Sequence, residues 1–131
     1  MSDNQQTLNY RELLDFCAKC AGEKLADDVI GLDCSRISSV ADYVLIATAG
    51  SEPQLRAISS FMERQVREVY QKRTLNQPDD ASSGWVLLDF GNLIVHLMTQ
   101  EMRGRYNLEG LWSDSVPVEL LSELANGRKT L

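Results

Sequence analysis

The chain has 131 residues, of which 44% are hydrophobic and 24% are charged, and its formal net charge is −6 at pH 7. These values predict one globular domain, long enough to bury a core without disulfide or metal staples. The acidic balance argues against direct, sequence-specific binding of nucleic acid, whose phosphates would repel the chain. It favours instead a protein that is steered toward a basic protein surface.

Targeting signals and membrane spans are missing from the sequence. No apolar run is long enough to cross a bilayer, so no membrane association is predicted. Residues 1–7 are polar and lack the basic and apolar regions of a signal or transit peptide. An odd number of cysteines without a secretion signal is typical of reduced thiols. We therefore expect a cytoplasmic protein.

The spacing of Cys17 and Cys20 raises the question of a zinc site, because Cys34 and His96 would complete a set of four ligands. A structural zinc site usually has a second closely spaced ligand pair, and the sequence has none. Both residues of the pair also fall on the apolar stripe of a predicted helix, where free cysteine behaves as a small hydrophobic residue. We predict no metal and no cofactor.

The first part of the chain predicts a helix followed by two strands. Apolar residues recur at three- and four-residue steps over 10–25, which is typical of an amphipathic helix. Residues 29–34 alternate, with Ile30, Leu32 and Cys34 on one side. Residues 41–48 are almost all apolar after Asp42, as expected of a central strand covered on both faces. Asp42 itself is either a solvated strand end or a fixed polar contact.

A second helix is predicted to begin after Gly50 and to run to about residue 71. Ser51 is a suitable N-cap, Gln54 can complete a capping box, and Pro53 falls in the first turn, where its missing N–H does no harm. A strand–glycine–helix junction can also bind phosphate through helix N–H groups. Here there is one glycine and no nearby lysine, which favours a structural break between the two elements.

The region 85–98 predicts a β-hairpin, because Gly91 and Asn92 tolerate the positive φ of a two-residue turn between two apolar runs. A short edge strand at 74–76 is predicted before it, followed by a polar loop. With Phe90 opposite Leu93, one face of the hairpin is entirely apolar and forms a core face; a register slip of one residue would exchange the faces. The apolar face carries Val86, Leu88, Phe90, Leu93, Val95 and Leu97, and the other carries Trp85, Leu87, Asp89, Ile94, His96 and Met98.

That second, mixed face is the candidate functional surface, because it holds a tryptophan and the single histidine of the chain. The alternative is a half-buried face that merely packs under a helix.

After the hairpin, Thr99 begins a short helix, and 117–124 predicts a last amphipathic turn or two. The order of elements predicts an α/β (α+β) fold: a mixed β-sheet with flanking helices on at least one face.

Four segments of the chain resemble the ribosomal silencing factor (Iojap) family: 33–35, 41–48, 85–96 and 106–114. The most specific combination is Trp-x-x-x-Asp-x-Gly followed by Val-His, and then Tyr-x-Leu-Glu-x-Leu-Trp. The resemblance runs in order from about residue 24 to residue 114. It implies a nucleotidyltransferase-like fold in a single domain, 1–131, with a core at about 9–114 and a C-terminal tail at 115–131.

The resemblance implies a protein that binds the large ribosomal subunit through a ribosomal protein of the intersubunit face. Occupying that protein blocks the joining of the small subunit and represses translation under nutrient limitation. Some members of the family form homodimers, and none is known for catalysis. By match to the family's motif, the partner-binding residues would be Asp42, Tyr43, Trp85, Leu87, Asp89, His96, Arg103, Tyr106, Leu108, Leu111 and Trp112.

An enzyme, or a nucleotide-binding protein of the same fold, is the alternative. Metal-dependent nucleotidyl transfer needs converging carboxylates, usually a pair two residues apart on one strand and a third nearby. Asp42 and Asp89 are single, and no such pair follows Gly50 and Ser51. A nucleophile made of Cys34 and His96 lacks a recognisable third group to orient it. The sequence therefore favours a binding protein without catalytic residues.

Overall fold

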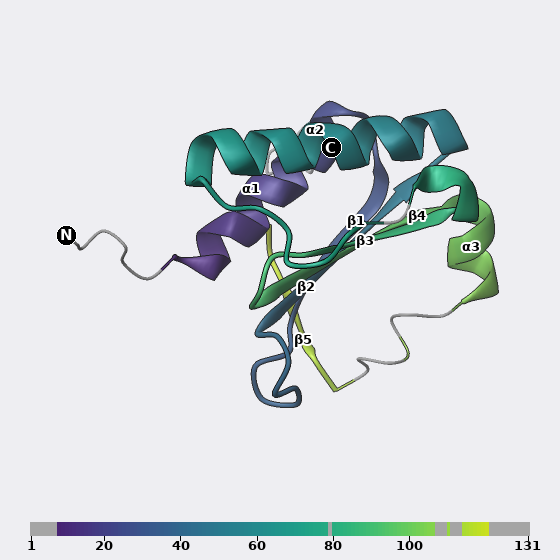
Figure 1. The fold of residues 1–131 in the computed structure, drawn as a ribbon. Helices are drawn as coiled ribbons and strands as arrows, with labels where there is room; N and C mark the ends of the chain where they lie inside the picture. Colours follow the sequence, from purple (N-terminus) through teal and green to yellow (C-terminus); the bar gives the residue numbers. More distant parts are fainter. Residues whose placement is uncertain (1–7, 79, 107–109, 111–113, 121–131) are drawn as a thin grey trace, which may run out of the picture.

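The computed structural model describes residues 8–78, 80–106, 110 and 114–120. Its centre is a five-stranded sheet with the strand order β3-β4-β2-β1-β5 (Figure 1). The central strands β2 and β4 are parallel, and every other neighbouring pair is antiparallel. The strands are β1 (Asp27–Asp33), β2 (Tyr43–Ala49), β3 (Trp85–Asp89), β4 (Leu93–Thr99) and β5 (Val116–Val118).

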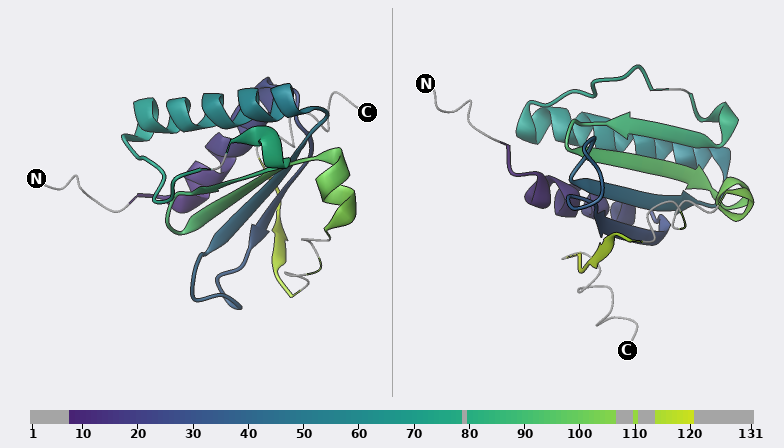
Figure 2. Two further views of the ribbon diagram at one scale, coloured as in Figure 1. Left: turned by 45° about the vertical axis from the view of Figure 1, so that its right-hand side comes forward. Right: turned by 90° about the horizontal axis from the view of Figure 1, so that it is seen from below.

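Two long helices, α1 (Tyr10–Glu23) and α2 (Glu52–Tyr70), cover one face of the sheet (Figures 1 and 2). Asn9 caps α1 by accepting a hydrogen bond from the N–H of Glu12, and Ser51 caps α2 by accepting one from the N–H of Gln54. The short helix α3 (Gln100–Arg105) follows β4 directly, and a 3-10 turn, η2 (Ala81–Ser83), precedes β3. The fold is therefore the predicted α+β arrangement of a mixed sheet with flanking helices.

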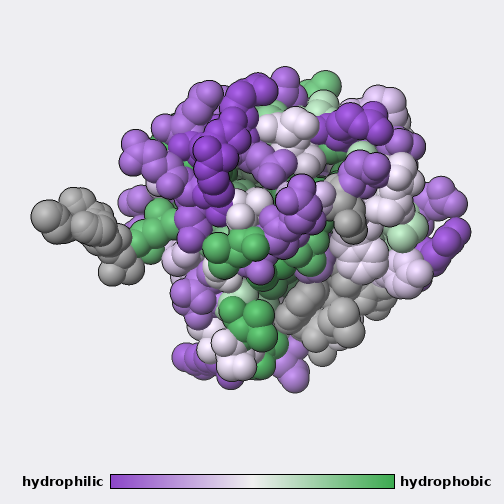
Figure 3. Space-filling view, viewed as in Figure 1, coloured by the Kyte–Doolittle hydropathy of each residue, from purple (hydrophilic) through white to green (hydrophobic). Residues whose placement is uncertain are grey.

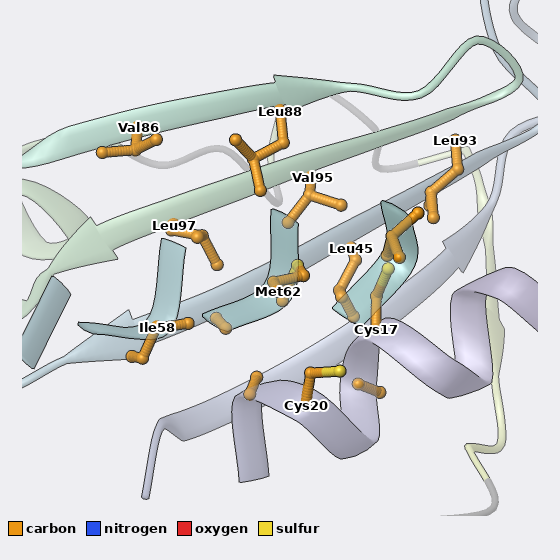
Figure 4. Packing of buried hydrophobic residues seen from close by; sticks show 14 of the residues in the cluster. Cys17, Cys20, Leu45, Ile58, Met62, Val86, Leu88, Leu93, Val95 and Leu97 are labelled. Carbon is orange, nitrogen blue, oxygen red and sulfur yellow. The ribbon is translucent and has the colours of Figure 1, made fainter. Parts of the chain in front are cut away.

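The hairpin of β3 and β4 has the predicted register. Trp85 pairs with Met98, Leu88 with Val95, and the N–H of Phe90 donates to the carbonyl oxygen of Leu93 at 2.9 Å. The predicted core face is confirmed, because all six of its side chains are at most 1% exposed. Figure 4 shows side chains of this face pointing toward residues of α1 and α2, with Leu45 of β2 beside them.

The opposite face of the sheet also has a buried centre. Leu32, Val44 and Ile46 are at most 6% exposed there, which confirms that β2 is a central strand covered on both faces. This second cluster consists of Leu32, Cys34, Val44, Ile46 and Met98, with Ile30, Trp85 and Met102 packed against it.

Two predicted elements differ in the structure. Residues 74–76 form no strand; the N–H of Leu75 donates to the carbonyl of Asp89, and the Asn76 side chain pairs with the β3 backbone instead. The predicted helical turn beginning at Pro117 is also wrong at its start, because Val116–Val118 pairs with β1. Pro117 fits there because proline is tolerated in an edge strand. Residues 121–124 lie outside the described part of the chain.

Candidate functional site: an aromatic cluster on the sheet face opposite the long helices

The side chains of β3 point alternately to the two faces of the sheet, and this alternation determines which of them belong to the candidate site. Because Val86 and Leu88 point into the main core, Trp85, Leu87 and Asp89 point to the other side of the sheet, and all three are half-buried. His96 of β4 lies directly opposite Leu87 in the antiparallel pair. We call these side chains, together with Ile94, the second face.

Trp85 and His96 are joined by a hydrogen bond. The indole Nε1–H of Trp85 donates to Nδ1 of His96 at 3.1 Å, and the two ring centroids lie 5.8 Å apart. An indole N–H can only donate, so Nδ1 must be unprotonated and the neutral ring carries its proton on Nε2. Burial lowers the pKa of His96 to about 4, because a buried site disfavours the charged imidazolium. The neutral form that accepts the bond is therefore the form present at pH 7.

Tyr106 extends this cluster from the end of α3. Its ring centroid lies 5.4 Å from that of Trp85, with the planes tilted by 46°, and 45% of the residue is exposed. The N–H of Tyr106 donates to the carbonyl of Met102, which anchors the residue to the helix. Trp85 and Tyr106 thus form one aromatic surface that is partly open to solvent.

Arg103 holds α3 against the sheet. Its guanidinium donates to the hydroxyl of Thr48 on β2 and, at 3.2 Å, to the carbonyl oxygen of Asp28 on β1. These contacts fix the helix from which Tyr106 extends. Sequence reasoning did not identify Thr48 and Asp28 as partners of Arg103, because they lie far from it along the chain.

The other predicted contact residues are distributed differently. Asp42 lies at the turn end of the hairpin, where its N–H and that of Tyr43 both donate to the carbonyl of Asn92. The carbonyl of Asp42 accepts from the N–H of Cys34 at 2.7 Å, so its backbone has fixed polar contacts. The side chain of Tyr43 packs against the main core, on the same side of the sheet as the long helices, away from Trp85. Leu108, Leu111 and Trp112 lie outside the described residues.

Asp89 differs from its neighbours on the second face because its carboxylate is engaged by the hairpin turn. Its Oδ1 accepts a hydrogen bond from the N–H of Gly91 at 2.9 Å. Gly91 has φ +104°, a backbone conformation that residues with a side chain rarely adopt. The carboxylate of Asp89 therefore helps to hold a turn that needs glycine.

The three cysteines are buried free thiols. Burial raises the pKa of Cys17 well above its ordinary value and that of Cys20 to about 11, so both are protonated and unreactive at pH 7. Within the described ranges, no group of three or more His, Cys, Asp or Glu side chains is arranged to hold a metal ion.

A cavity of about 550 Å³ lies where α2 begins, lined in part by Gly50, Ser51, Glu52 and Glu101. Two N–H groups at this helix start have side-chain partners: that of Gly50 donates to Oε1 of Gln54 at 2.7 Å, and that of Gln54 donates to the hydroxyl of Ser51 at 3.2 Å. Gln54 therefore binds Gly50 rather than completing the predicted capping box with the N–H of Ser51. Both carboxylates of the lining are paired with arginine, Glu52 with Arg56 at 2.9 Å and Glu101 with Arg105 at 3.4 Å, and Arg105 itself lines the cavity.

No helix in the described part of the chain is long and apolar enough to cross a membrane. The fold and the second face define a small α+β protein: a mixed sheet with two long helices on one side and an aromatic cluster on the other. The chain belongs to the ribosomal silencing factor family, whose model, "Ribosomal silencing factor during starvation", matches residues 7–130. That description names silencing of the ribosome and no chemical reaction.

Individual relatives agree with this assignment. The chain is 36% identical to the ribosomal silencing factor RsfS of Bacillus subtilis over 114 residues, covering 86% of this chain and 95% of the relative. It is 35% identical to the chloroplast protein Iojap of Zea mays over 120 residues, covering 90% of this chain and 50% of the relative.

Solved structures show the same fold. A crystal structure from Chromobacterium violaceum superposes with a TM-score of 0.75 at 25% identity, covering 81% of this chain and 88% of the other. One from Bacillus halodurans superposes with a TM-score of 0.72 at 32% identity, covering 84% and 99%.

Proposed function

We propose that this protein binds the large ribosomal subunit through a ribosomal protein of the intersubunit face and blocks the joining of the small subunit. Translation would fall as a result, under nutrient limitation and in the cytoplasm, where free subunits assemble. The contact is made by the second face together with Tyr106, and Trp85 and Tyr106 are its principal residues. Homodimer formation is a further expectation from the family resemblance.

The observation that carries this proposal is the contact between the half-buried Trp85 and the exposed Tyr106 in a chain of the silencing-factor family. Tryptophan and tyrosine are among the residues that dominate the binding energy of protein interfaces, because they bury large areas and lose little conformational entropy. Leu87, the next residue of β3 on this face, and Ile94, nearer the hairpin turn, are both half-buried and supply further apolar surface.

The other side of the molecule offers a different surface. Figure 3 shows hydrophilic side chains covering much of α2. Arg56 and Glu52 form an ion pair of 2.9 Å on that helix, and both are well exposed. Such a solvated surface is typical of the outside of a globular protein, which leaves the second face as the better candidate for a protein partner.

Sedimentation of purified ribosomal subunits tests the proposal. We expect the protein to migrate with large subunits and to reduce the fraction of whole ribosomes. Trp85→Ala should weaken binding to the large subunit by about 2 kcal/mol or more, roughly a thirtyfold loss of affinity, as expected for an aromatic interface residue.

Phe61→Ala is the matched control for this variant. Phe61 is also a half-buried aromatic residue, but it lies on α2 beside Lys24, whose ammonium is 4.7 Å from the ring centroid. Circular dichroism should show that both variants are folded. Wild-type protein that binds neither subunit would refute the proposed function, whereas equal affinity of wild type and Trp85→Ala would remove Trp85 from the contact.

A further inference from the structure

His96 has little surface to offer a partner, because it is 7% exposed. It lies on a central strand, between β3 and β2, and its Nδ1 is occupied by the indole N–H of Trp85. Trp85, by contrast, is half-buried and contacts the exposed ring of Tyr106. The two members of this hydrogen bond are therefore unequal: one is buried and one reaches the surface.

We propose that His96 is a positioning residue, which serves partner binding by holding the indole of Trp85 in one orientation rather than by contacting the partner itself. This inference rests on the proposed function, since the binding it supports is that of the large ribosomal subunit. A consequence is that the partner meets the ring surface of Trp85, because the N–H of the indole is already engaged inside the protein.

The position of Trp85 at the start of β3 explains why its hydrogen bond to His96 matters. Trp85 is the first residue of β3, opposite Met98 of β4, and its N–H donates to the Ser83 hydroxyl at 3.3 Å. A side chain at a strand end can adopt more than one rotamer, and ordering such a side chain on binding costs conformational entropy. The bond to His96 fixes the indole before the partner arrives, so that this ordering is already complete in the free protein.

Two substitutions at position 96 separate positioning from packing. His96→Leu fills a similar volume but cannot accept a hydrogen bond. His96→Asn shares the Cβ and Cγ of histidine, and its Oδ1 takes the place of Nδ1, so it keeps an acceptor at the same distance from the backbone. If His96 acts through Trp85, His96→Leu should weaken binding to the large subunit about five- to tenfold, the change that one hydrogen bond typically carries. His96→Asn should retain most of the wild-type affinity.

The state of the indole is measured independently by ¹H–¹⁵N NMR of the free protein, with the Trp85 side-chain signal assigned by Trp85→Phe. We expect His96→Leu to shift this signal and to broaden it, and His96→Asn to keep it sharp and near its wild-type position. In a Trp85→Phe background, where no indole remains to be held, His96→Leu should cause no further loss of affinity.

The results separate two kinds of failure. An unchanged indole signal in His96→Leu, or an equal loss of affinity from that substitution with and without Trp85, would overturn the positioning role. So would a folded His96→Asn variant that binds as poorly as His96→Leu. Wild-type protein with no affinity for large subunits would instead refute the proposed function, and the indole signal would still decide whether His96 orders Trp85.

Discussion

At the scale of single residues, His96 combines a buried ring with a hydrogen bond that only its neutral form accepts. The lowered pKa, about 4, has burial as its cause. In the unfolded chain the same side chain titrates near 6.5, the ordinary value for histidine. Between these two values the unfolded state binds a proton that the folded state excludes. The contribution of His96 to stability is therefore fully present above about pH 6.5 and is lost as the pH falls toward 4.

We expect the free energy of unfolding to fall by up to about 3 kcal/mol from this residue alone as the pH is lowered through that interval. Urea unfolding at several pH values measures it, and His96→Asn, which does not titrate, is the control. Carboxylates titrate in both proteins, so the difference between them isolates the histidine. The same pH dependence in both would contradict the pKa assigned to His96.

At the scale of elements, the outer edge of β3 is covered by the segment that precedes the hairpin. The amide of Asn76 donates to the carbonyl of Leu87 at 2.9 Å, and its oxygen accepts from the N–H of Asp89 at 3.0 Å. The N–H of Leu75 adds a backbone bond to the carbonyl of Asp89 at 2.7 Å. One side chain thus replaces part of a strand, and it satisfies an edge that could otherwise pair with another chain.

Asn76→Ala should lower the free energy of unfolding by about 1–3 kcal/mol, because two hydrogen bonds are lost and their β3 partners are exposed. The matched control is Gln77→Ala, which changes an exposed neighbour of similar chemistry. Chemical denaturation compares the two variants. A control that is destabilised as much as Asn76→Ala would show that the effect does not come from the β3 edge.

At the scale of the whole molecule, the charge of −6 acts together with the aromatic cluster. The rings supply short-range binding energy, whereas net charge acts over a Debye length and raises the rate of encounter with a basic partner. The two effects therefore belong to different rate constants: the aromatic contact to dissociation and the charge to association.

The association rate with large subunits should fall severalfold as the ionic strength rises from about 0.05 to about 0.5 M, because salt screens the attraction. Stopped-flow or surface-binding kinetics measure this change. Trp85→Ala should speed dissociation and leave the salt dependence of association unchanged. An association rate that does not respond to salt would rule out electrostatic steering.

Local patterns in the sequence determined those features whose interacting residues are close to one another along the chain. The turn residues Gly91 and Asn92 set the register of the hairpin, and that register determined which side chains of β3 and β4 enter the core. Ser51 likewise marked the start of α2. These predictions succeeded because the physical cause, a turn geometry or a cap, lies within a few residues of its effect.

Only the tertiary structure decided how distant segments meet. The contact between Trp85 and Tyr106 depends on where α3 lies, and Arg103 holds that helix by reaching β1 and β2. The side taken by Tyr43 could not be predicted, because a strand that is apolar throughout has no alternation to distinguish its faces. The strand at Val116–Val118 exists only through its pairing with β1. Such contacts are selected by packing and hydrogen bonding across the whole fold, and no short stretch of sequence contains that information.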